Sequence, residues 1–235
     1  TVDKKAFEKV IQDVRNRFPI KRIIFLADRG CISEALLEGI RAMKMEYIVG
    51  SRMRVEKMVR ERVLKTGGRY ATYDETLAYK EVHVDSERYL VIRNKSQAER
   101  DRFVRETLLA DLAEKEGQSL KGLTRNRGYR KFLKNTGKIE IDPAKIKAEA
   151  RYDGKWVLRT NVTDMSGPDL IESYKTLATV ENWFRILRTS LDVRPVFHWT
   201  LDRVRAHIFI CFLGMKIWNH FSEALKLHDS TVLIH

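Results

Sequence analysis

The segment Arg22-Ile23-Ile24-Phe25-Leu26-Ala27 is a short apolar run that leads directly into Asp28-Arg29-Gly30. A continuous apolar run of this length predicts a β-strand that is buried on both faces. An aspartate at the carboxyl end of such a strand lies where open α/β sheets place their functional residues, and Gly30 allows a tight turn after it. The stretch therefore predicts an α/β fold with Asp28 at a candidate site. A simple turn or capping role for Asp28 remains open.

The flanking patterns extend this prediction on both sides. Apolar residues at helical spacing predict a helix over residues 3–18, which Pro19 ends. Ser33 is placed to cap a second helix over residues 34–43, and Tyr47-Ile48-Val49-Gly50 has the pattern of the next strand. The order helix, strand, helix, strand is typical of the α/β class.

Residues 51–154 have a different composition, rich in Lys and Arg. Within them, Leu77 to Val84 and Arg88 to Arg93 predict a β-hairpin. Ser96 with Glu99 has the pattern of a capping box, which predicts the start of a charged helix. We interpret the segment as a β-rich and helical insertion in the α/β domain.

The α/β pattern returns with a predicted strand over Lys155 to Thr160. Ser166 and Pro168 predict the start of a long helix that ends near residue 190, and a last helix is expected over 201–225. The predicted organisation is a core whose first part is 1–50, an insertion over 51–154, and the second part of the core with the C-terminal helix over 155–235.

The charge of the chain indicates a polyanionic partner. Lys and Arg number 45 against 32 Asp and Glu, a formal net charge of +13, which favours nucleic acid before an anionic membrane. No apolar run approaches the roughly 20 residues that span a bilayer. Two cysteines make no disulfide framework. We expect a cytoplasmic protein with no membrane partner, associated with the nucleoid when it is bound to DNA.

The predicted long helix carries Tyr174, Glu181 and Arg188 at steps of seven residues, which places them on one stripe. Arg185 follows Glu181 by one turn. An acidic residue flanked by cations suits a metal ion beside a phosphate. The sequence therefore predicts Asp28 and Glu181 as catalytic metal ligands. The alternative is a surface ion pair between Glu181 and Arg185, which contributes little to stability.

These residues resemble a known signature. Tyr174, Leu177, Glu181 and Arg188 are similar to the Tyr-x2-Arg-x3-Glu-x6-Lys pattern of insertion-sequence DDE transposases of the cut-and-paste group. Leucine replaces the arginine of the pattern, which removes one phosphate-binding cation, and arginine replaces the lysine. Arg185 is placed to compensate in part for the lost cation.

Further segments carry the same resemblance over nearly the whole chain. The run from Leu26 to Gly30 resembles the second-aspartate motif of the family, and Tyr152-Asp153-Gly154 and the segment 191–196 are also similar to family segments. The resemblance implies an RNase H-like core with a β-rich insertion before the glutamate helix. It also implies nicking of transposon ends and transfer of the freed 3′-OH, with Mg²⁺ as cofactor and Mn²⁺ as a possible substitute.

The implied partners are double-stranded DNA, as terminal inverted repeats and as target, and a second copy of the chain on that DNA. Tyr174, Arg185 and Arg188 are the residues expected to position the scissile phosphate.

The first aspartate of the family lies on an opening strand well upstream of the second, whereas Asp3 falls at the start of the first predicted helix. We therefore expect an N-terminally incomplete core that lacks its first strands and one metal ligand, and an isolated chain that is inactive. Two other functions remain open, which are a non-catalytic DNA-binding relic or domesticated protein, and a structure-specific nuclease.

Two further features are DNA-binding candidates. Trp156, on the strand before the glutamate helix, could stack on a flipped base as in some relatives, although a core or edge-strand aromatic is the simpler interpretation. The basic stretch Lys121 to Lys138, which includes Arg130 and Lys131, could follow phosphates without sequence specificity. A solvated basic loop is the alternative for that stretch.

Overall fold

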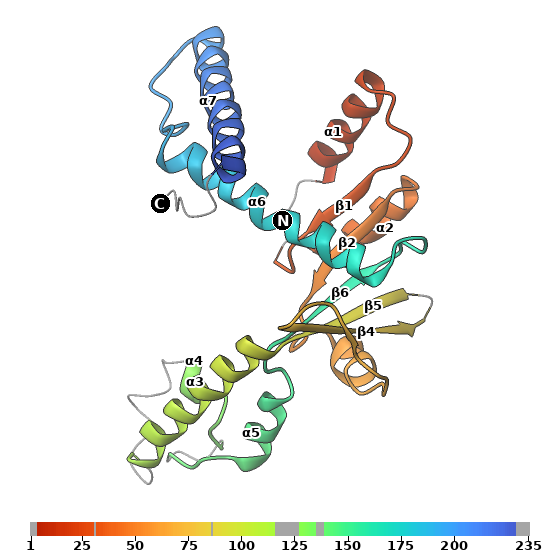
Figure 1. Cartoon of the computed structure of the whole chain (residues 1–235), viewed down its shortest axis with the longest axis vertical. Helices are drawn as coiled ribbons and strands as arrows, with labels where there is room; N and C mark the ends of the chain where they lie inside the picture. Colours follow the sequence, from red (N-terminus) through yellow and green to blue (C-terminus); the bar gives the residue numbers. More distant parts are fainter. Residues whose placement is uncertain (1–3, 31, 86, 116–126, 135–138, 229–235) are drawn as a thin grey trace. The chain divides into compact units, whose positions relative to one another are not determined.

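The computed structural model describes residues 4–30, 32–85, 87–115, 127–134 and 139–228. The chain divides into two compact units, Thr1–Tyr174 and Lys175–His235. Each unit is described by itself, with its elements labelled in Figure 1. Among the described residues, no helix combines the length and the apolar character needed to cross a membrane.

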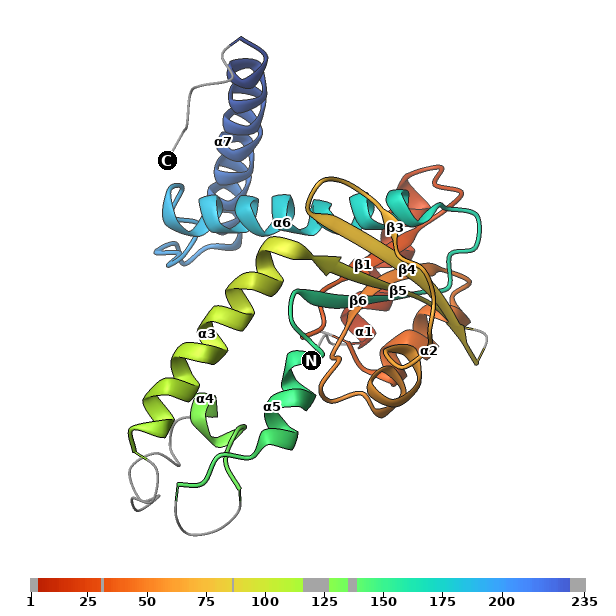
Figure 2. The same ribbon diagram turned by 60° about the horizontal axis from the view of Figure 1, so that its bottom comes forward.

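The first unit is built on one six-stranded sheet with the strand order β1-β2-β6-β5-β4-β3 (Figures 1 and 2). The first two strands in this order are parallel, and every other neighbouring pair is antiparallel. The sheet and its helices form a mixed α/β fold, as the sequence predicts. The strands are β1 Ile24–Ala27, β2 Glu46–Ser51, β3 Ala71–Thr72, β4 Leu77–Val84, β5 Glu87–Asn94 and β6 Lys155–Thr160.

Six of the seven described α-helices begin in the first unit. They are α1 Lys4–Arg17, α2 Glu34–Ala42, α3 Lys95–Ala113, α4 Arg127–Arg130, α5 Pro143–Ala150 and α6 Gly167–Thr189, with one π-helical turn, η1 Val59–Val63. The boundary between the units falls within α6, after Tyr174. The second unit contains the rest of α6 and the helix α7 Leu201–His228.

Both faces of the sheet are covered by helices. On one face, Leu170 and Ile171 at the start of α6 pack on Ile48, Leu90 and Leu158. On the other face, the helix α2 packs on the parallel pair β1 and β2, and the turn η1 packs on β4, β5 and β6. The alternation of β6 places Val157 on the α2 and η1 side and Leu158 on the α6 side, as the period of a strand requires.

The strand β1 is not fully buried as the sequence predicted. It lies at an edge of the sheet, and Ile24, Phe25 and Leu26 are half-buried while Ala27 is buried. Its apolar run is still explained by packing on both faces, because Phe25 contacts the α2 side and Leu26 contacts the α6 side. The edge position, which no local pattern encodes, accounts for the remaining exposure.

The predicted helix starts are right at two positions and wrong at one. Ser33 accepts a hydrogen bond from the Leu36 amide of α2 at 3.3 Å. Ser166 accepts one from the Asp169 amide of α6, also at 3.3 Å. The helix α3 is capped by Asn94 rather than by Ser96, because Asn94 ends β5 in an extended conformation and its side chain accepts from the Gln97 amide.

The predicted insertion 51–154 contributes β3, β4 and β5 to the same sheet as the flanking strands. The predicted hairpin is therefore confirmed as β4 and β5. Its helices α3, α4 and α5 pack around a separate small cluster of Leu112, Phe132, Leu133 and Ile139. The division of the chain into core and insertion at residues 50 and 154 stays a prediction.

Candidate functional site

Asp28 lies directly after the carboxyl end of β1, as predicted. Because β1 and β2 are parallel and Ala27 is opposite Val49, the two strands end side by side, with Gly50 next to Asp28. The Tyr174 hydroxyl donates a hydrogen bond of 3.1 Å to Oδ1 of Asp28. The first unit thus brings together two residues that the sequence singled out in separate motifs.

Gly50 makes room for this hydrogen bond. A Cβ placed on Gly50 comes within 2.6 Å of the Tyr174 hydroxyl oxygen and 3.2 Å of the Arg29 amide nitrogen. The tyrosine side chain therefore reaches Asp28 by passing over a bare stretch of β2 backbone. A glycine inside a strand is a signal of such a close approach, and it could have pointed to Gly50 from the sequence alone.

The start of α6 is held firmly against the sheet, which fixes the position of Tyr174. Leu170 and Ile171 are buried, and they precede Tyr174 by four and three residues, so the three side chains share one helix face. Gly167 lies under the Tyr79 ring, whose nearest atom would be 2.3 Å from a Cβ added at that glycine. A larger residue at Gly167 would lift the helix from the sheet.

The other predicted members of the site lie in the second unit. Glu181 and Arg188 are exposed within that unit and lie further along α6 on the Tyr174 stripe. The Arg185 guanidinium donates to Oδ1 of Asn182 at 2.6 Å, and within the described part of the chain it forms no ion pair with Glu181. The alternative of a Glu181–Arg185 ion pair is therefore not observed.

The latter part of α6 is tied to α7 within the second unit. The Trp183 indole donates to Oδ1 of Asn219 at 3.2 Å. Leu191, just after α6, packs on Gly214 of α7, and the Cys211 thiol donates to the Leu191 carbonyl at 3.3 Å. These contacts hold the helix segment that carries Glu181.

Among the described residues, no group of three or more His, Cys, Asp or Glu side chains is arranged to hold a metal ion. Mg²⁺ often takes only one or two carboxylates, with substrate phosphates and water completing its shell. Asp28 fits this mode, because its carboxylate is exposed at the end of β1. Glu181 offers a second exposed carboxylate, on the second unit.

Trp156 lies on β6 opposite Ile92. Its half-buried side chain packs against the cluster on the α6 side of the sheet. This packing accounts for an aromatic residue at the position. A base-stacking role for Trp156 stays a prediction.

The two basic candidates lie in and after the short helix α4. Lys131 forms an ion pair of 3.3 Å with Glu149, and its ammonium lies 4.8 Å from the Phe132 ring centroid. Arg130 is exposed at the end of α4. Most of the predicted basic stretch Lys121 to Lys138 lies outside the described residues, so its role in DNA binding stays a prediction.

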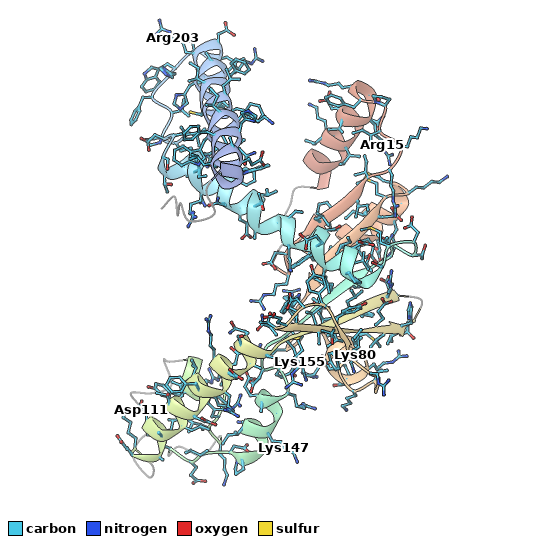
Figure 3. All side chains as sticks on the ribbon, in the orientation of Figure 1. Arg15, Lys80, Asp111, Lys147, Lys155 and Arg203 are labelled. Carbon is cyan, nitrogen blue, oxygen red and sulfur yellow. The ribbon has the colours of Figure 1, made fainter. Side chains whose placement is uncertain are left out.

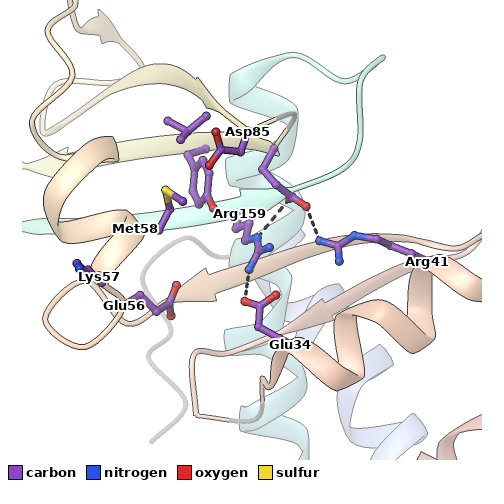
Figure 4. Close-up of a pocket in the computed structure, with 10 residues that line it drawn as sticks. Glu34, Arg41, Glu56, Lys57, Met58, Asp85 and Arg159 are labelled. Carbon is purple, nitrogen blue, oxygen red and sulfur yellow. Dashed lines mark hydrogen bonds and ion pairs between the residues drawn. The ribbon is translucent and has the colours of Figure 1, made fainter.

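A charged pocket of about 470 Å³ opens beside α2 on the first unit (Figure 4). Its charges are largely paired with one another. Arg159 contacts Glu34 at 2.5 Å and Glu87 at 3.2 Å, and Arg41 contacts Glu87 as well. The Tyr47 hydroxyl also donates to Glu87 at 2.7 Å. This closed network links α2, β2, β5 and β6 and is best explained as structural.

Comparison with known proteins agrees with this geometry. A protein-family model described as Transposase DDE domain matches residues 1–215. No curated protein and no solved structure matches the chain significantly. The family match covers most of the chain, including the end of β1, the start of α6 and Glu181. The chain therefore belongs to the transposase DDE domain family.

Proposed function

We propose that this chain supplies metal ligands and phosphate-binding residues to a transposase that cuts DNA at transposon ends and transfers the freed strand. One observation carries the proposal, which is the hydrogen bond from Tyr174 to Asp28. The tyrosine of the predicted glutamate helix meets the predicted aspartate at the end of β1. Two motifs that are distant in the sequence thus share one location in the first unit.

In the proposed site, the carboxylates of Asp28 and Glu181 hold Mg²⁺, or Mn²⁺ in its place. The bound metal would stabilise negative charge on the attacking and leaving oxygens of the phosphodiester. Tyr174 orients the Asp28 carboxylate, and the guanidinium groups of Arg185 and Arg188 hold the scissile phosphate, since planar cations suit phosphate oxygens.

We further propose that the parallel unit β1-α2-β2 and the start of α6 belong to an RNase H-like core. The support is the parallel register of β1 with β2 and the position of Asp28 after β1. The proposed partners are terminal inverted repeats, target DNA and a second copy of the chain on DNA. The charge of +13 supports the DNA assignment.

An excision assay tests the proposal. The complete reading frame is expressed beside a reporter plasmid that carries the ends of the element, as wild type, Asp28→Asn, Glu181→Gln and the control Glu38→Gln. Glu38 is an exposed carboxylate of α2. We expect excision by the wild type and the control and none by the other two variants. Excision that persists in Asp28→Asn would overturn the proposal.

Two other results of the same work bear on the remaining alternatives. DNA binding by a wild type that never excises the element would identify a DNA-binding relic. Cleavage that needs no terminal repeats would identify a nuclease. The inactivity of the isolated chain also stays a prediction, and Mg²⁺-dependent plasmid nicking that is lost in Asp28→Asn would contradict it.

A further inference from the structure

A second hollow of about 460 Å³ lies on the first unit, where β5 and β6 meet the helices α3 and α5. Four cations line it, Arg93, Lys95, Arg102 and Lys155, together with the acidic residues Glu99 and Asp153. We call it the Arg93–Lys155 hollow. Lys155 is labelled in Figure 3, near the start of β6.

The two cations that name the hollow oppose each other in the sheet. Arg93 of β5 and Lys155 of β6 are direct cross-strand partners. Like charges at directly opposed positions destabilise a sheet. Burial lowers the pKa of Lys155, and the nearby charges of Arg93 and Lys80 lower it further. The fold therefore keeps an unfavourable pair of cations at this place.

Of the two carboxylates that line the hollow, Asp153 is already engaged. Asp153 forms an ion pair of 2.5 Å with Arg105, and both side chains are largely buried. Asp101 accepts from the Gly154 amide at 2.8 Å. Lys155 donates to a neutral acceptor, the Arg151 carbonyl, at 2.9 Å. Within the described residues, neither Arg93 nor Lys155 forms an ion pair with a carboxylate.

The hollow thus differs from the pocket in Figure 4, where arginines and glutamates neutralise one another. Glu99 is the one lining carboxylate that forms no ion pair among the described residues, against the cations Arg93, Lys95 and Lys155. An excess of positive charge in a concave site favours an anion with several acceptor oxygens. Phosphate is the anion that the net charge of the chain already indicates.

The sheet also places the hollow near Asp28. Ser51 at the end of β2 is opposite Val157, so β6 begins at the same end of the sheet at which β1 and β2 finish. Strand spacing and rise put Lys155 roughly 15 Å from Asp28 in the plane of the sheet. Lys155 shares the face of Val157, the face away from α6. The Asp28 carboxylate meets Tyr174 on the α6 face, so the two sites lie at the same end of the sheet on opposite faces. A few base pairs, at about 3.4 Å each, cover the in-plane part of this separation.

We propose that the Arg93–Lys155 hollow binds a backbone phosphate of DNA a few nucleotides away from the cleavage point. This inference rests on the proposed function, which supplies DNA as the polyanion and Asp28 as the cleavage point. A phosphate here relieves the repulsion between the opposed cations. It also anchors the duplex at the end of the sheet that carries Asp28, without reading its sequence.

Salt-dependent binding tests the inference. The affinity of the purified chain for a fluorescent duplex is measured by anisotropy from 50 to about 300 mM salt, for the wild type, Lys155→Gln, Arg93→Gln and the double variant. The loss of one phosphate contact lowers the slope of log K against log salt by about 0.9 and weakens binding about eightfold at 0.1 M salt. We expect this lower slope and weaker binding in the double variant. Lys155→Arg keeps the positive charge and is expected to keep the slope of the wild type.

The matched control is Lys57→Gln, which removes an exposed cation elsewhere on the first unit. An equal loss of slope in Lys57→Gln and in the double variant, or no loss in the double variant, overturns the inference. Inorganic phosphate provides a second measurement. If millimolar phosphate raises the Tm of the wild type but not of the double variant, and DNA affinity is the same in both, the hollow is a small-anion site and the DNA proposal is wrong.

These results are separable from the proposed function. A changed slope in a protein that never excises its element would leave the phosphate contact at the hollow standing while the proposed function, and with it the cleavage point, fails. Excision that needs Asp28, together with an unchanged slope in the double variant, would leave the proposed function standing while the inference fails.

Discussion

The Tyr174 hydroxyl lies 3.1 Å from Oδ1 of Asp28 and donates a hydrogen bond to it across 146 residues of sequence. The contact joins the carboxyl end of β1 to the first part of α6. It depends on the bare backbone of Gly50, over which the tyrosine passes. The aspartate is thereby oriented by a residue of the helix that also carries Glu181.

Replacing Tyr174 with Phe removes this hydrogen bond and keeps the aromatic ring. A hydrogen bond of this kind contributes about 1 kcal/mol, and less where it is exposed. We expect the free energy of unfolding of the first unit to fall by no more than about that amount, as measured by urea denaturation. Excision activity is expected to fall, because the Asp28 carboxylate is no longer oriented.

Tyr79→Phe is the matched control, since Tyr79 belongs to the same cluster and packs on Gly167. Its hydroxyl forms no hydrogen bond among the described residues. If Tyr79→Phe and Tyr174→Phe reduce excision equally, the special role of Tyr174 is wrong.

Replacing Gly50 with Ala displaces the Tyr174 hydroxyl, because the new Cβ would lie 2.6 Å from its oxygen. Overpacking of this kind costs about 1–3 kcal/mol. In the Tyr174→Phe background the clashing atom is absent, so the added cost of Gly50→Ala is expected to be smaller there. A double-mutant cycle by urea denaturation measures the difference. Strictly additive costs would show that the two side chains do not meet.

Much of the local structure follows from sequence patterns. The strand β6 has the predicted bounds, the hairpin of β4 and β5 is present, and Ser33 and Ser166 cap the predicted helices. Each of these features depends on residues close together in the chain. Asn94 was missed as a cap because it ends a strand, and the sequence gives equal weight to Ser96 two residues later.

The long-range arrangement could not be predicted in this way. The pairing of β6 with both β2 and β5, and the edge position of β1, depend on which distant strands meet. The sequence named Asp28 and Tyr174, and a glycine inside a strand could have marked Gly50 as a place of close approach, but that Tyr174 is the residue which approaches it is known only from the packing of α6 on β2. Trp156 and Lys131 carry the residue types of a DNA contact and are also engaged in packing or an ion pair.

Gly154 is expected to tolerate no side chain. It has φ +61° in the turn before β6, and an added Cβ would lie 2.3 Å from the Asn94 carbonyl oxygen and 2.6 Å from the Ala98 amide nitrogen. The left-handed conformation alone costs about 1–2 kcal/mol for alanine, and the backbone clash adds to this. We expect Gly154→Ala to lower the free energy of unfolding by at least about 2 kcal/mol in urea denaturation.

Gly67 provides the control for this substitution. A Cβ on Gly67 meets nothing within 4 Å. Gly67→Ala should therefore leave the free energy of unfolding unchanged or raise it slightly. Equal destabilisation by the two substitutions would contradict the turn geometry at Gly154.

Acid is expected to loosen the attachment of α5. Burial acts to raise the pKa of Glu149, but the hydrogen bond from Arg54 and the charges of Arg54 and Lys131 outweigh it and hold that pKa below its ordinary value. A carboxyl with a lowered folded pKa contributes stability that is present above its unfolded pKa of about 4.3 and is lost as the pH falls through the folded pKa. Unfolding measured between pH 7 and pH 3 should show this loss.

Glu149→Gln removes the titrating group and should flatten that part of the pH profile. Glu38→Gln, at an exposed carboxylate of α2, should leave the profile as in the wild type. If Glu149→Gln loses as much stability at low pH as the wild type does, other carboxyl groups govern that loss.

Asp28 and Glu181 are proposed to hold the same metal ion, and Mn²⁺ binding tests this most directly. The affinity for Mn²⁺ is measured by electron paramagnetic resonance in the presence of duplex DNA, for the wild type, Asp28→Asn, Glu181→Gln, the double variant and Glu38→Gln. If one ion is shared, each single variant loses most of the binding, the double variant loses little more, and the control binds as the wild type does. Independent, additive losses, or full binding by Asp28→Asn, would contradict the shared site.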